Sequence, residues 1–267
     1  MPPTDSLDVE LEGAVNFREV TTVVVDGGRR RLRRGLLYRS GATHRMAPAV
    51  LEHLARDRGV RSVIDLRTEF EVVNVGRAPF EAAGITHYHA PMQDPADRNR
   101  EARAERLEQF RTGRFDWAAC YLRVAGAHHD QLRRAFELAA GAAEAAIVVH
   151  CAAGRDRTGV TIALLLAALG ADPDDIADDY HLSGERLVRH VELFMKPYNG
   201  DPSRLTREEV VRLLDTERAS MVRFLDGLAE AYGSIAAYLA TIGVGEALIT
   251  SLRERFLEPV PAEPTAK

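Results

Sequence analysis

The sequence has few cysteines and no excess of positive charge. Its two cysteines, Cys120 and Cys151, are too few to form a disulfide framework. Lysine and arginine together number 35 against 40 aspartates and glutamates, and the net charge of −5 excludes a general electrostatic attraction to DNA, RNA or an anionic membrane. Only Lys196 and Lys267 are lysines, and this preference for arginine is typical of a high-GC bacterial gene. We therefore expect no nucleic-acid partner, and any anion-binding site must be local.

The sequence also lacks long hydrophobic runs and a recognisable export signal. The longest uninterrupted apolar stretch, at 162–169, is far shorter than the roughly 20 residues that cross a bilayer. Residues 1–6 have neither the basic nor the apolar part of a secretory signal. We expect a cytoplasmic protein without stable membrane insertion, while export that needs no such signal stays open. The oligomeric state is left unpredicted.

Short β-branched segments predict a sheet in the first part of the chain. Such segments lie at 21–26, 33–40, 60–66, 85–90 and 146–150. The first two flank Gly27 and Gly28, so we expect them to form a hairpin. The last three are short and apolar, as buried strands are.

Helical patterns alternate with these strands and then dominate the chain. Helices are predicted at 48–58, at 115–140 with a break near Gly126, and at 158–169, with further helices starting near Asp172, Thr206, Ser234 and Val244. The segment at 158–169 is apolar on nearly every side and is therefore expected to be buried. Asp172 precedes Pro173, and Thr206 stands three residues before Glu209, which are both patterns of a helix N-terminus.

This order of elements predicts one α/β domain, with a central sheet flanked by helices and a helical C-terminal extension. A chain of 267 residues, 46% of them hydrophobic, suits a single large domain. We place this domain at 11–257, after an N-terminal tail at 1–10. The extension covers about 172–230, and a separate helical subdomain there is the alternative. Proline alternates with small or polar residues at 258–267, which predicts a disordered tail.

The segment around Cys151 has the pattern of a phosphate-binding loop. Cys151 follows the predicted strand at 146–150, and the predicted buried helix begins a few residues later. Four residues at or just after the loop are small: Ala152, Ala153, Gly154 and Gly159. Small residues let backbone N–H groups approach a phosphate at the start of a helix.

Two side chains of this segment would perform the chemistry. Backbone dipoles, the helix N-terminus and the positive charge of Arg157 all favour the thiolate of Cys151, which is the nucleophilic form. The guanidinium of Arg157 can also bind two phosphate oxygens at once. Attack on phosphorus gives a cysteinyl-phosphate that water then hydrolyses, and this chemistry needs no metal or other cofactor.

The loop resembles a known signature. Residues 150–159 read His-Cys-Ala-Ala-Gly-Arg-Asp-Arg-Thr-Gly, which resembles the loop of the cysteine-dependent protein tyrosine phosphatase superfamily, in particular its bacterial group with His-Cys-x-x-Gly-Lys-Asp-Arg-Thr-Gly. Segments at 13–19, 36–41, 65–71 and 232–243 are similar to further elements of that group. The resemblance implies a tyrosine-phosphatase-like domain that hydrolyses phosphotyrosine and, in some members, phosphoserine, phosphothreonine or phosphoinositides. The implied partner is a phosphorylated protein or a phosphoinositide.

The resemblance also implies roles for individual residues. The phosphate would be bound by Arg157 and by the loop residues Ala152, Ala153, Gly154, Arg155, Thr158 and Gly159. Asp156 is the first candidate for the general acid, because it resembles the loop aspartate of myotubularin-type phosphatases. Asp65, at the end of a predicted strand, and Asp94 are the rival candidates.

Three departures from the family pattern limit the transfer. Arg155 replaces the usual lysine, which keeps the charge but changes its shape and its hydrogen-bonding geometry. Glu19 stands where aspartate is usual, and we assign it no catalytic role. The only tryptophan, Trp117, is followed by Ala118, so the mobile Trp-Pro-Asp loop of larger tyrosine phosphatases has no counterpart.

Several residues near the motif have a structural alternative. Arg155 either contacts substrate or is a solvated charge, and Thr158 either caps the helix or, as in the family, assists the thiolate. We expect His150 to stabilise the loop by hydrogen bonding and Cys120 to belong to the core. The cluster at 128–130 is not expected to bind metal, because adjacent histidines on a helix point in different directions.

The favoured function is a metal-independent phosphomonoesterase. The alternatives are a phosphate-binding protein without turnover, and sulfur or arsenate transfer through the same type of loop. Retention of both Cys151 and Arg157 argues against the first. About 150 residues precede the loop, unlike in the low-molecular-weight relatives, which weakens the second. By resemblance, the helices between Tyr180 and Leu225 would cover the site as a lid.

Overall fold

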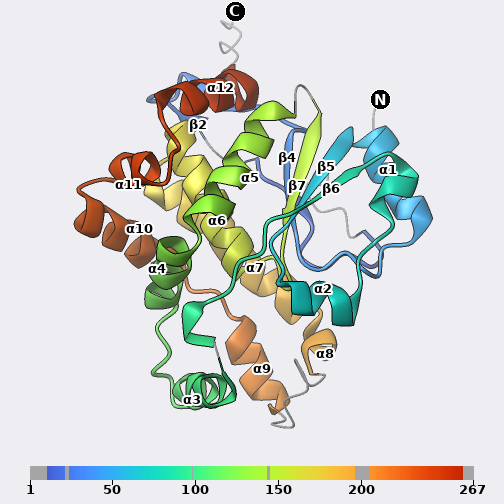
Figure 1. The fold of residues 1–267 in the computed structure, drawn as a ribbon, viewed down its shortest axis with the longest axis vertical. Helices are drawn as coiled ribbons and strands as arrows, with labels where there is room; N and C mark the ends of the chain where they lie inside the picture. The colour runs from blue at the N-terminus through green and yellow to red at the C-terminus, as the bar shows by residue number, and fades with distance from the viewer. Residues whose placement is uncertain (1–10, 22–23, 98, 143–144, 196–204, 261–267) are drawn as a thin grey trace, which may run out of the picture.

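A five-stranded sheet runs through the centre of the molecule (Figure 1). The computed structural model describes residues 11–21, 24–97, 99–142, 145–195 and 205–260. In spatial order, the strands are β1 (Arg18–Glu19), β4 (Leu37–Ser40), β7 (Ala146–His150), β5 (Val60–Asp65) and β6 (Thr86–His89). Four of them are parallel, and β1 pairs antiparallel with β4 at one edge. The strands predicted at 60–66, 85–90 and 146–150 are thus confirmed. The expected burial is wrong for β6, because this strand lies at the edge of the sheet and none of its four residues is buried.

The central strand β7 is mostly apolar and buried along its whole length, as is typical of a parallel sheet that is covered by helices on both faces. All five of its residues, Ala-Ile-Val-Val-His, are buried, so it can lie only between two layers of side chains. One face packs against α1 (Pro48–Asp57) and the short helix η1 (Phe80–Ala83), and the other face carries the main core. Figure 1 shows the larger group of helices on one side of the sheet and α1 on the other.

The main core is built around α6 (Asp156–Leu169). Its residues are buried at nearly every position, as predicted from its sequence. The helices around it are α4 (Trp117–Ala127), α5 (His129–Gly141), α7 (Pro173–Val188), α10 (Arg218–Tyr232), α11 (Ile235–Thr241) and α12 (Glu246–Phe256). Because α7 and α10 contribute Tyr180 and Leu225 to this core, much of the predicted extension belongs to the main body.

The strand predicted at 21–26 pairs with a different segment than expected. Strand β2 (Val24–Val25) pairs with β3 (Arg30–Leu32), and β3 pairs in turn with β8 (Leu257–Pro259) in a separate antiparallel sheet. The segment at 33–40 instead supplies β4 to the main sheet. Gly35, with φ of 75°, lies between the two strands in a backbone conformation that favours glycine.

The C-terminal segment is ordered farther than predicted. Disorder was expected from Glu258, but Glu258 and Pro259 lie in β8, where Glu258 forms an ion pair of 2.8 Å with Arg31. Backbone pairing with β3 outweighs the disorder-prone composition of this segment. The predicted tails at 1–10 and beyond Val260 lie outside the described residues.

Several helix boundaries follow from capping groups. Asp172 caps α7, and Ser234 caps α11, as predicted. The break in the helical pattern at 115–140 falls at His128 and not at Gly126. The last helix begins at Glu246 instead of Val244.

Four helices had no predicted start: α2 (Glu69–Val75), α3 (Arg100–Arg111), α8 (Val191–Phe194) and α10. Helix α2 has only seven residues, and α3 buries none of its side chains. Neither offers the apolar periodicity by which a helix is found in a sequence. Helix α10 has no side-chain cap at its N-terminus, and α8 has only four residues.

Two short helices lie apart from the main core. They are α8 (Val191–Phe194) and α9 (Arg207–Leu214), the second of which is capped by Thr206 as predicted. They form a small cluster of their own, centred on Leu187, Val191, Val210 and Leu214. In Figure 1, both helices lie below the same end of the sheet as α2.

Within the described residues, no single helix has both the length and the apolar character needed to cross a bilayer. Helices α11 and α12 pass that test only together, and they are bent by 115° at their junction. Leu239 and Phe256 of this pair are buried in the main core.

The buried helix α6 gives a stability prediction. Replacing the fully buried Leu164 with alanine should lower the free energy of unfolding by about 2–5 kcal/mol, because the cavity cannot refill. The control is Leu182→Ala on α7, where the side chain is exposed and the loss should be about 0.5 kcal/mol or less. Urea unfolding monitored by circular dichroism measures both, and equal losses would contradict the assignment of Leu164 to the core.

Candidate active site

The Cys151 loop lies at the carboxyl end of the central strand. Strand β7 ends at His150, and α6 begins at Asp156, so the residues between them form a tight strand–loop–helix connection. In open α/β sheets, ligands bind beyond the carboxyl ends of the strands. Helices α2, α8 and α9 lie at this end of the sheet (Figure 1).

The loop curls around the sulfur of Cys151. The backbone N–H of Gly154 donates a hydrogen bond to the Cys151 Sγ, with an N–S distance of 3.3 Å. Gly154 has φ of 70°, and a Cβ there would lie 2.4 Å from the Ser40 carbonyl oxygen. Only glycine therefore allows this close approach between the loop and the end of β4.

Arg157 is held by a glutamate that the sequence did not single out. Its two terminal nitrogens contact the two carboxylate oxygens of Glu71 at 2.6 and 2.9 Å. Glu71 also closes the capping box of α2, because its Oε2 accepts from the Thr68 N–H at 2.8 Å. A fork-to-fork pair of this kind fixes the plane of a guanidinium. The Thr68-x-x-Glu71 capping pattern was the available sequence signal for α2.

Arg155 bridges the loop to the surrounding helices. Its side chain is 4% exposed, so it is not a solvated charge. The guanidinium lies over the ring of Trp117 at 4.0 Å and donates to the carbonyl groups of Leu213, in the last turn of α9, and Asp215, which directly follows α9. It also pairs with Asp156 at 3.0 Å. The guanidinium of Arg155, which was a candidate for direct contact with substrate, is therefore bound by other groups of the protein.

Asp156 is the partly exposed carboxylate of the loop. Its side chain is 30% exposed, and its Oδ1 accepts from the Tyr121 hydroxyl at 2.7 Å. The Tyr121 hydroxyl in turn contacts the Tyr180 hydroxyl. Burial alone would raise the pKa of Asp156, but the charge and hydrogen bond of Arg155, with the bond from Tyr121, hold that pKa below its ordinary value. Asp156 is therefore ionised in the unliganded protein at neutral pH.

Asp65, the second candidate acid, is fully buried beneath the loop. Arg67 binds it through Nε at 3.0 Å and through a terminal nitrogen at 2.7 Å, and His87 lies 3.2 Å from the same carboxylate. Burial alone would raise the pKa of Asp65, but His150, His87 and Arg67 lower it far below the ordinary range. The carboxylate is therefore held ionised and away from solvent.

His150 packs between Asp65 and the nucleophile. Its Nε2 lies 3.5 Å from Asp65, and its Nδ1 lies 3.3 Å from the carbonyl oxygen of Cys151. Burial lowers the pKa of His150 to about 4, so the ring is neutral at neutral pH. These contacts agree with the predicted stabilising role.

The Asp65 cluster is also the place to test for a metal site. Among the described residues, Asp65, His87 and His150 are the one group of three possible ligands that lie close enough together. Arg67 already binds both oxygens of Asp65, and a cation there would face that guanidinium. The group therefore does not suit a cation. The residues at 128–130 do not form a ligand group either; His128 instead bonds to the backbone of Gln93.

Asp94, the third candidate acid, is bound by arginines. Arg123 contacts its two oxygens at 2.9 and 2.7 Å, and Arg106 lies 3.8 Å away. Burial would raise the pKa of Asp94, but hydrogen bonds from Arg123 and from the Ala96 N–H lower it. Nearby, burial raises the pKa of the Cys120 thiol, which keeps it neutral in the core, as predicted.

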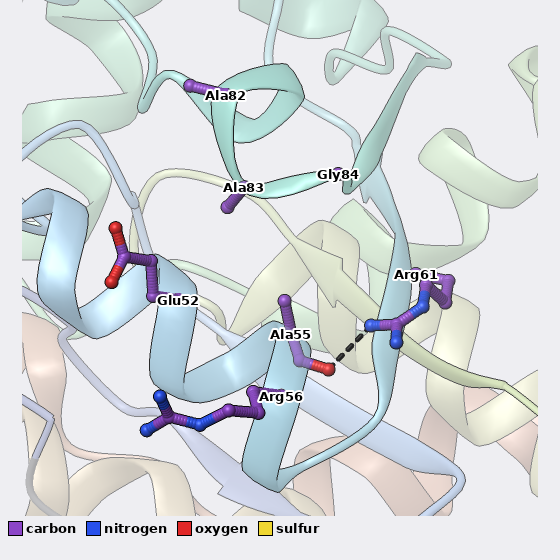
Figure 2. Close-up of a pocket in the computed structure, with 7 residues that line it drawn as sticks. All are labelled: Glu52, Ala55, Arg56, Arg61, Ala82, Ala83 and Gly84. Atoms are coloured by element: carbon purple, nitrogen blue, oxygen red, sulfur yellow. Dashed lines mark hydrogen bonds between the residues drawn. The ribbon is translucent and has the colours of Figure 1, made fainter.

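A hollow of about 600 Å³ on the surface lies away from the loop. It is lined by Glu52, Ala55, Arg56, Arg61, Ala82, Ala83 and Gly84, from α1, η1 and the start of β5 (Figure 2). Arg61 donates across it to the carbonyl of Ala55. None of the loop residues lines it, so it is no part of the candidate site.

The strand–loop–helix connection at Cys151 is of the kind that binds phosphate, and comparison with known proteins identifies the family. The tyrosine phosphatase family matches residues 9–258. The chain therefore belongs to the tyrosine phosphatase family, and it is an enzyme of the phosphatase class.

Individual relatives agree with this assignment. The triple specificity protein phosphatase PtpB of Mycobacterium tuberculosis is 29% identical, over 91% of this chain and 97% of its own. A Cupriavidus necator protein assigned as a tyrosine-protein phosphatase is 34% identical, over 67% of this chain and 64% of its own. The solved structure of TpbA from P. aeruginosa aligns at 18% identity over 61% of this chain and 78% of its own, with a TM-score of 0.31. That structural likeness is too weak to carry an argument, so the family assignment rests on sequence.

The pairing of Glu71 with Arg157 gives a prediction for catalysis. Glu71→Gln should lower kcat/KM about 10- to 100-fold, because the guanidinium loses the fork that fixes its orientation toward phosphate. The matched control is Glu69→Gln, an exposed residue in the first turn of the same helix. Steady-state assays with an aryl phosphate measure both, and unchanged kinetics in Glu71→Gln would contradict this role.

Proposed function

We propose that this protein hydrolyses phosphomonoesters, phosphotyrosine above all, through a cysteinyl-phosphate on Cys151. The observation that carries the proposal is the Gly154 N–H directed at the Cys151 sulfur, in a loop that opens α6. Backbone donors and a helix N-terminus stabilise both a thiolate and a bound phosphate. Arg157, held in position by Glu71, adds a fixed positive charge at the same end of the sheet.

The reaction has two steps in which the electrons and protons balance. The Cys151 thiolate attacks phosphorus, the bond from phosphorus to the ester oxygen breaks, and the leaving oxygen receives a proton from the general acid. Water then attacks phosphorus and gives a proton to the carboxylate that acted as the general acid, and the bond from phosphorus to sulfur breaks. This step releases inorganic phosphate and regenerates both the thiolate and the protonated acid.

Arg157 and the N–H groups of residues 152–155 and 158 would bind the phosphate oxygens. The Gly159 N–H, which the sequence also suggested, instead donates to the Arg155 carbonyl at 2.7 Å in the first turn of α6.

We assign the general acid to Asp156. Asp65 and Asp94 are buried and tied to arginines, whereas Asp156 is partly exposed at the loop. A phosphate dianion bound beside Asp156 would raise its pKa, because like charges favour the protonated form. With its pKa raised, Asp156 takes up a proton from solvent and can then donate that proton to the leaving oxygen.

Thr158 supports the nucleophile in this proposal. Its side chain is fully buried, and its hydroxyl has no hydrogen-bond partner within the part of the chain that the structure describes. It stands in the first turn of α6, seven residues after Cys151 in the chain. We assign it the role that the family resemblance implies, in which its hydroxyl assists the Cys151 thiolate.

The substrate is a phosphorylated protein or a phosphoinositide. A relative that covers nearly the whole chain is named for triple specificity. We therefore extend the proposal to phosphoserine, phosphothreonine and phosphoinositides as secondary substrates. We further place the protein in the cytoplasm, with no nucleic-acid partner, in keeping with its net charge of −5.

Helices α8 and α9 would restrict access to the loop. Ala153 of the loop packs against their apolar cluster, and Arg155 donates to two carbonyl groups at the C-terminal end of α9. These are contacts that a lid must break in order to open. We propose this lid role for the pair α8–α9 rather than for the whole of 172–230.

Replacing the nucleophile tests the reaction. Cys151→Ser should abolish phosphate release from phosphotyrosine, while wild-type activity should persist in EDTA because no metal takes part. Malachite-green assays on phosphotyrosine, phosphoserine and phosphoinositide substrates give both results and the substrate ranking. Wild-type protein that binds these compounds without releasing phosphate would refute the proposal in favour of a binding module.

Replacing Asp156 tests the general acid. Asp156→Asn should slow hydrolysis of phosphotyrosine about 100-fold or more, but should slow an activated aryl phosphate much less, because a good leaving group needs no proton. Asp94→Asn is the comparison for the rival carboxylate. Equal, small losses on both substrates in Asp156→Asn would rule out Asp156 as the acid.

A further inference from the structure

Three consecutive carbonyl groups of the phosphate loop point away from the sulfur and into the protein. The Ala152 carbonyl accepts from the Ala42 N–H at 2.8 Å. The side-chain amide of Asn16 donates to the carbonyls of Ala153 and Gly154 at 3.1 and 3.0 Å. The Gly154 carbonyl also accepts from Arg39 at 2.8 Å.

The direction of these carbonyls fixes the direction of the N–H groups that follow them. A trans peptide is planar, so the N–H of each next residue points opposite to the carbonyl. Because the carbonyls of residues 152–154 are held away from the Cys151 sulfur, the N–H groups of residues 153–155 point toward it. The Gly154 N–H that contacts the sulfur is one of these three.

The groups that hold the carbonyls are themselves held by one carboxylate on α7. Asp179 pairs with Arg39 and with Arg18, and all three side chains are at least 95% buried. Arg18 also donates to the Asn16 side-chain oxygen and to the backbone carbonyl of Asp179, the latter at 2.6 Å. Asp179 thus connects to the loop by two routes, one through Arg39 and one through Arg18 and Asn16.

The charge balance of this group is unusual for a buried cluster. Two arginines share one aspartate, so a net positive charge lies buried directly behind the loop. Burial would raise the pKa of Asp179, but Arg39 and Arg18 hold it below the ordinary value, so the carboxylate stays ionised. A buried positive charge on this side favours an anion on the other.

We propose that Asp179 is a positioning residue for catalysis, which acts through Arg39, Arg18 and Asn16 to aim the N–H groups of residues 153–155 at the phosphate. The inference rests on the proposed function, since it explains how the phosphate-binding N–H groups of the same loop are oriented. The carboxylate of Asp179 pairs with Arg18 and Arg39 and has no hydrogen bond to the sulfur of Cys151. Its effect on catalysis is transmitted entirely by the orientation of the peptide groups.

The test uses three variants that break the network at different points. Asp179→Asn keeps the shape and removes the charge, and Arg39→Lys keeps the charge and loses one of two hydrogen bonds. Asn16→Gly deletes the amide that binds two carbonyls, and glycine tolerates the φ of 56° at this position. Because Asn16→Gly leaves no new unpaired charge on the loop side, it remains decisive if Asp179→Asn does not fold.

The matched control is Ser183→Ala. Ser183 is fully buried on α7 and accepts a hydrogen bond of 3.0 Å from Arg18, but it does not contact the loop. Without the Ser183 hydroxyl, Arg18 keeps its hydrogen bonds to Asn16 and to Asp179, so both routes to the loop stay intact. The loss of Ser183 should therefore affect stability and leave catalysis unchanged.

Two measurements separate positioning from stability. Inorganic phosphate binding is measured by calorimetry with each variant in a Cys151→Ser background, and kcat and KM are measured in the Cys151 protein. We expect phosphate affinity and kcat to fall about 10- to 100-fold in each folded network variant, and both to stay within about twofold in Ser183→Ala.

The outcomes distinguish this inference from the proposed function. Normal phosphate affinity and kcat in folded Asn16→Gly and Arg39→Lys would overturn the positioning role, and so would an equal loss in Ser183→Ala. Wild-type protein that binds phosphate but releases none from substrates would refute the proposed function. The calorimetric measurement of phosphate binding would still decide the role of Asp179.

Discussion

The orientation of the peptide groups after Cys151 is the constraint on which the rest of the structure depends. A thiol can act on phosphate only if donors surround it, and here the donors are backbone N–H groups whose direction is set from behind. Gly154 permits the required backbone conformation, and its close approach to Ser40 ties the loop to the pairing of β4 with β7. The sheet and the site therefore form one unit.

Burial and pairing divide the charged residues of the site into two groups. Asp65, Asp94 and Asp179 are buried and bound by arginines, so each is an anchor that keeps its charge. Asp156 is the partly exposed loop carboxylate, and it is bound by one arginine and one tyrosine hydroxyl. A bound phosphate can shift the proton equilibrium of such a group more readily than that of a fully buried ion pair.

Much of the fold could be predicted from local patterns. The strands β5, β6 and β7, the buried helix α6, and the caps at Asp172, Thr206 and Ser234 all follow from periodicity and capping residues. Of the helices that were missed, α2 and α8 are short and α3 buries no side chain. Helix α10 was missed although it has an apolar face, because no capping residue marks its start. The wrong partner for β2 arose because local patterns give the existence of a strand but not its neighbour.

The sequence by itself determined the loop, since residues 150–159 are contiguous and their chemistry follows from residue type and order. Only the tertiary structure decided what surrounds it. Glu71 lies 86 residues from Arg157, and Asp179 lies 140 from Arg39, so no local pattern could join either pair. Arg155 was likewise a candidate for direct contact with substrate, but in the folded chain its guanidinium contacts α9 and the ring of Trp117. Partners of buried charges are chosen by packing between distant segments, and packing is a property of the folded chain.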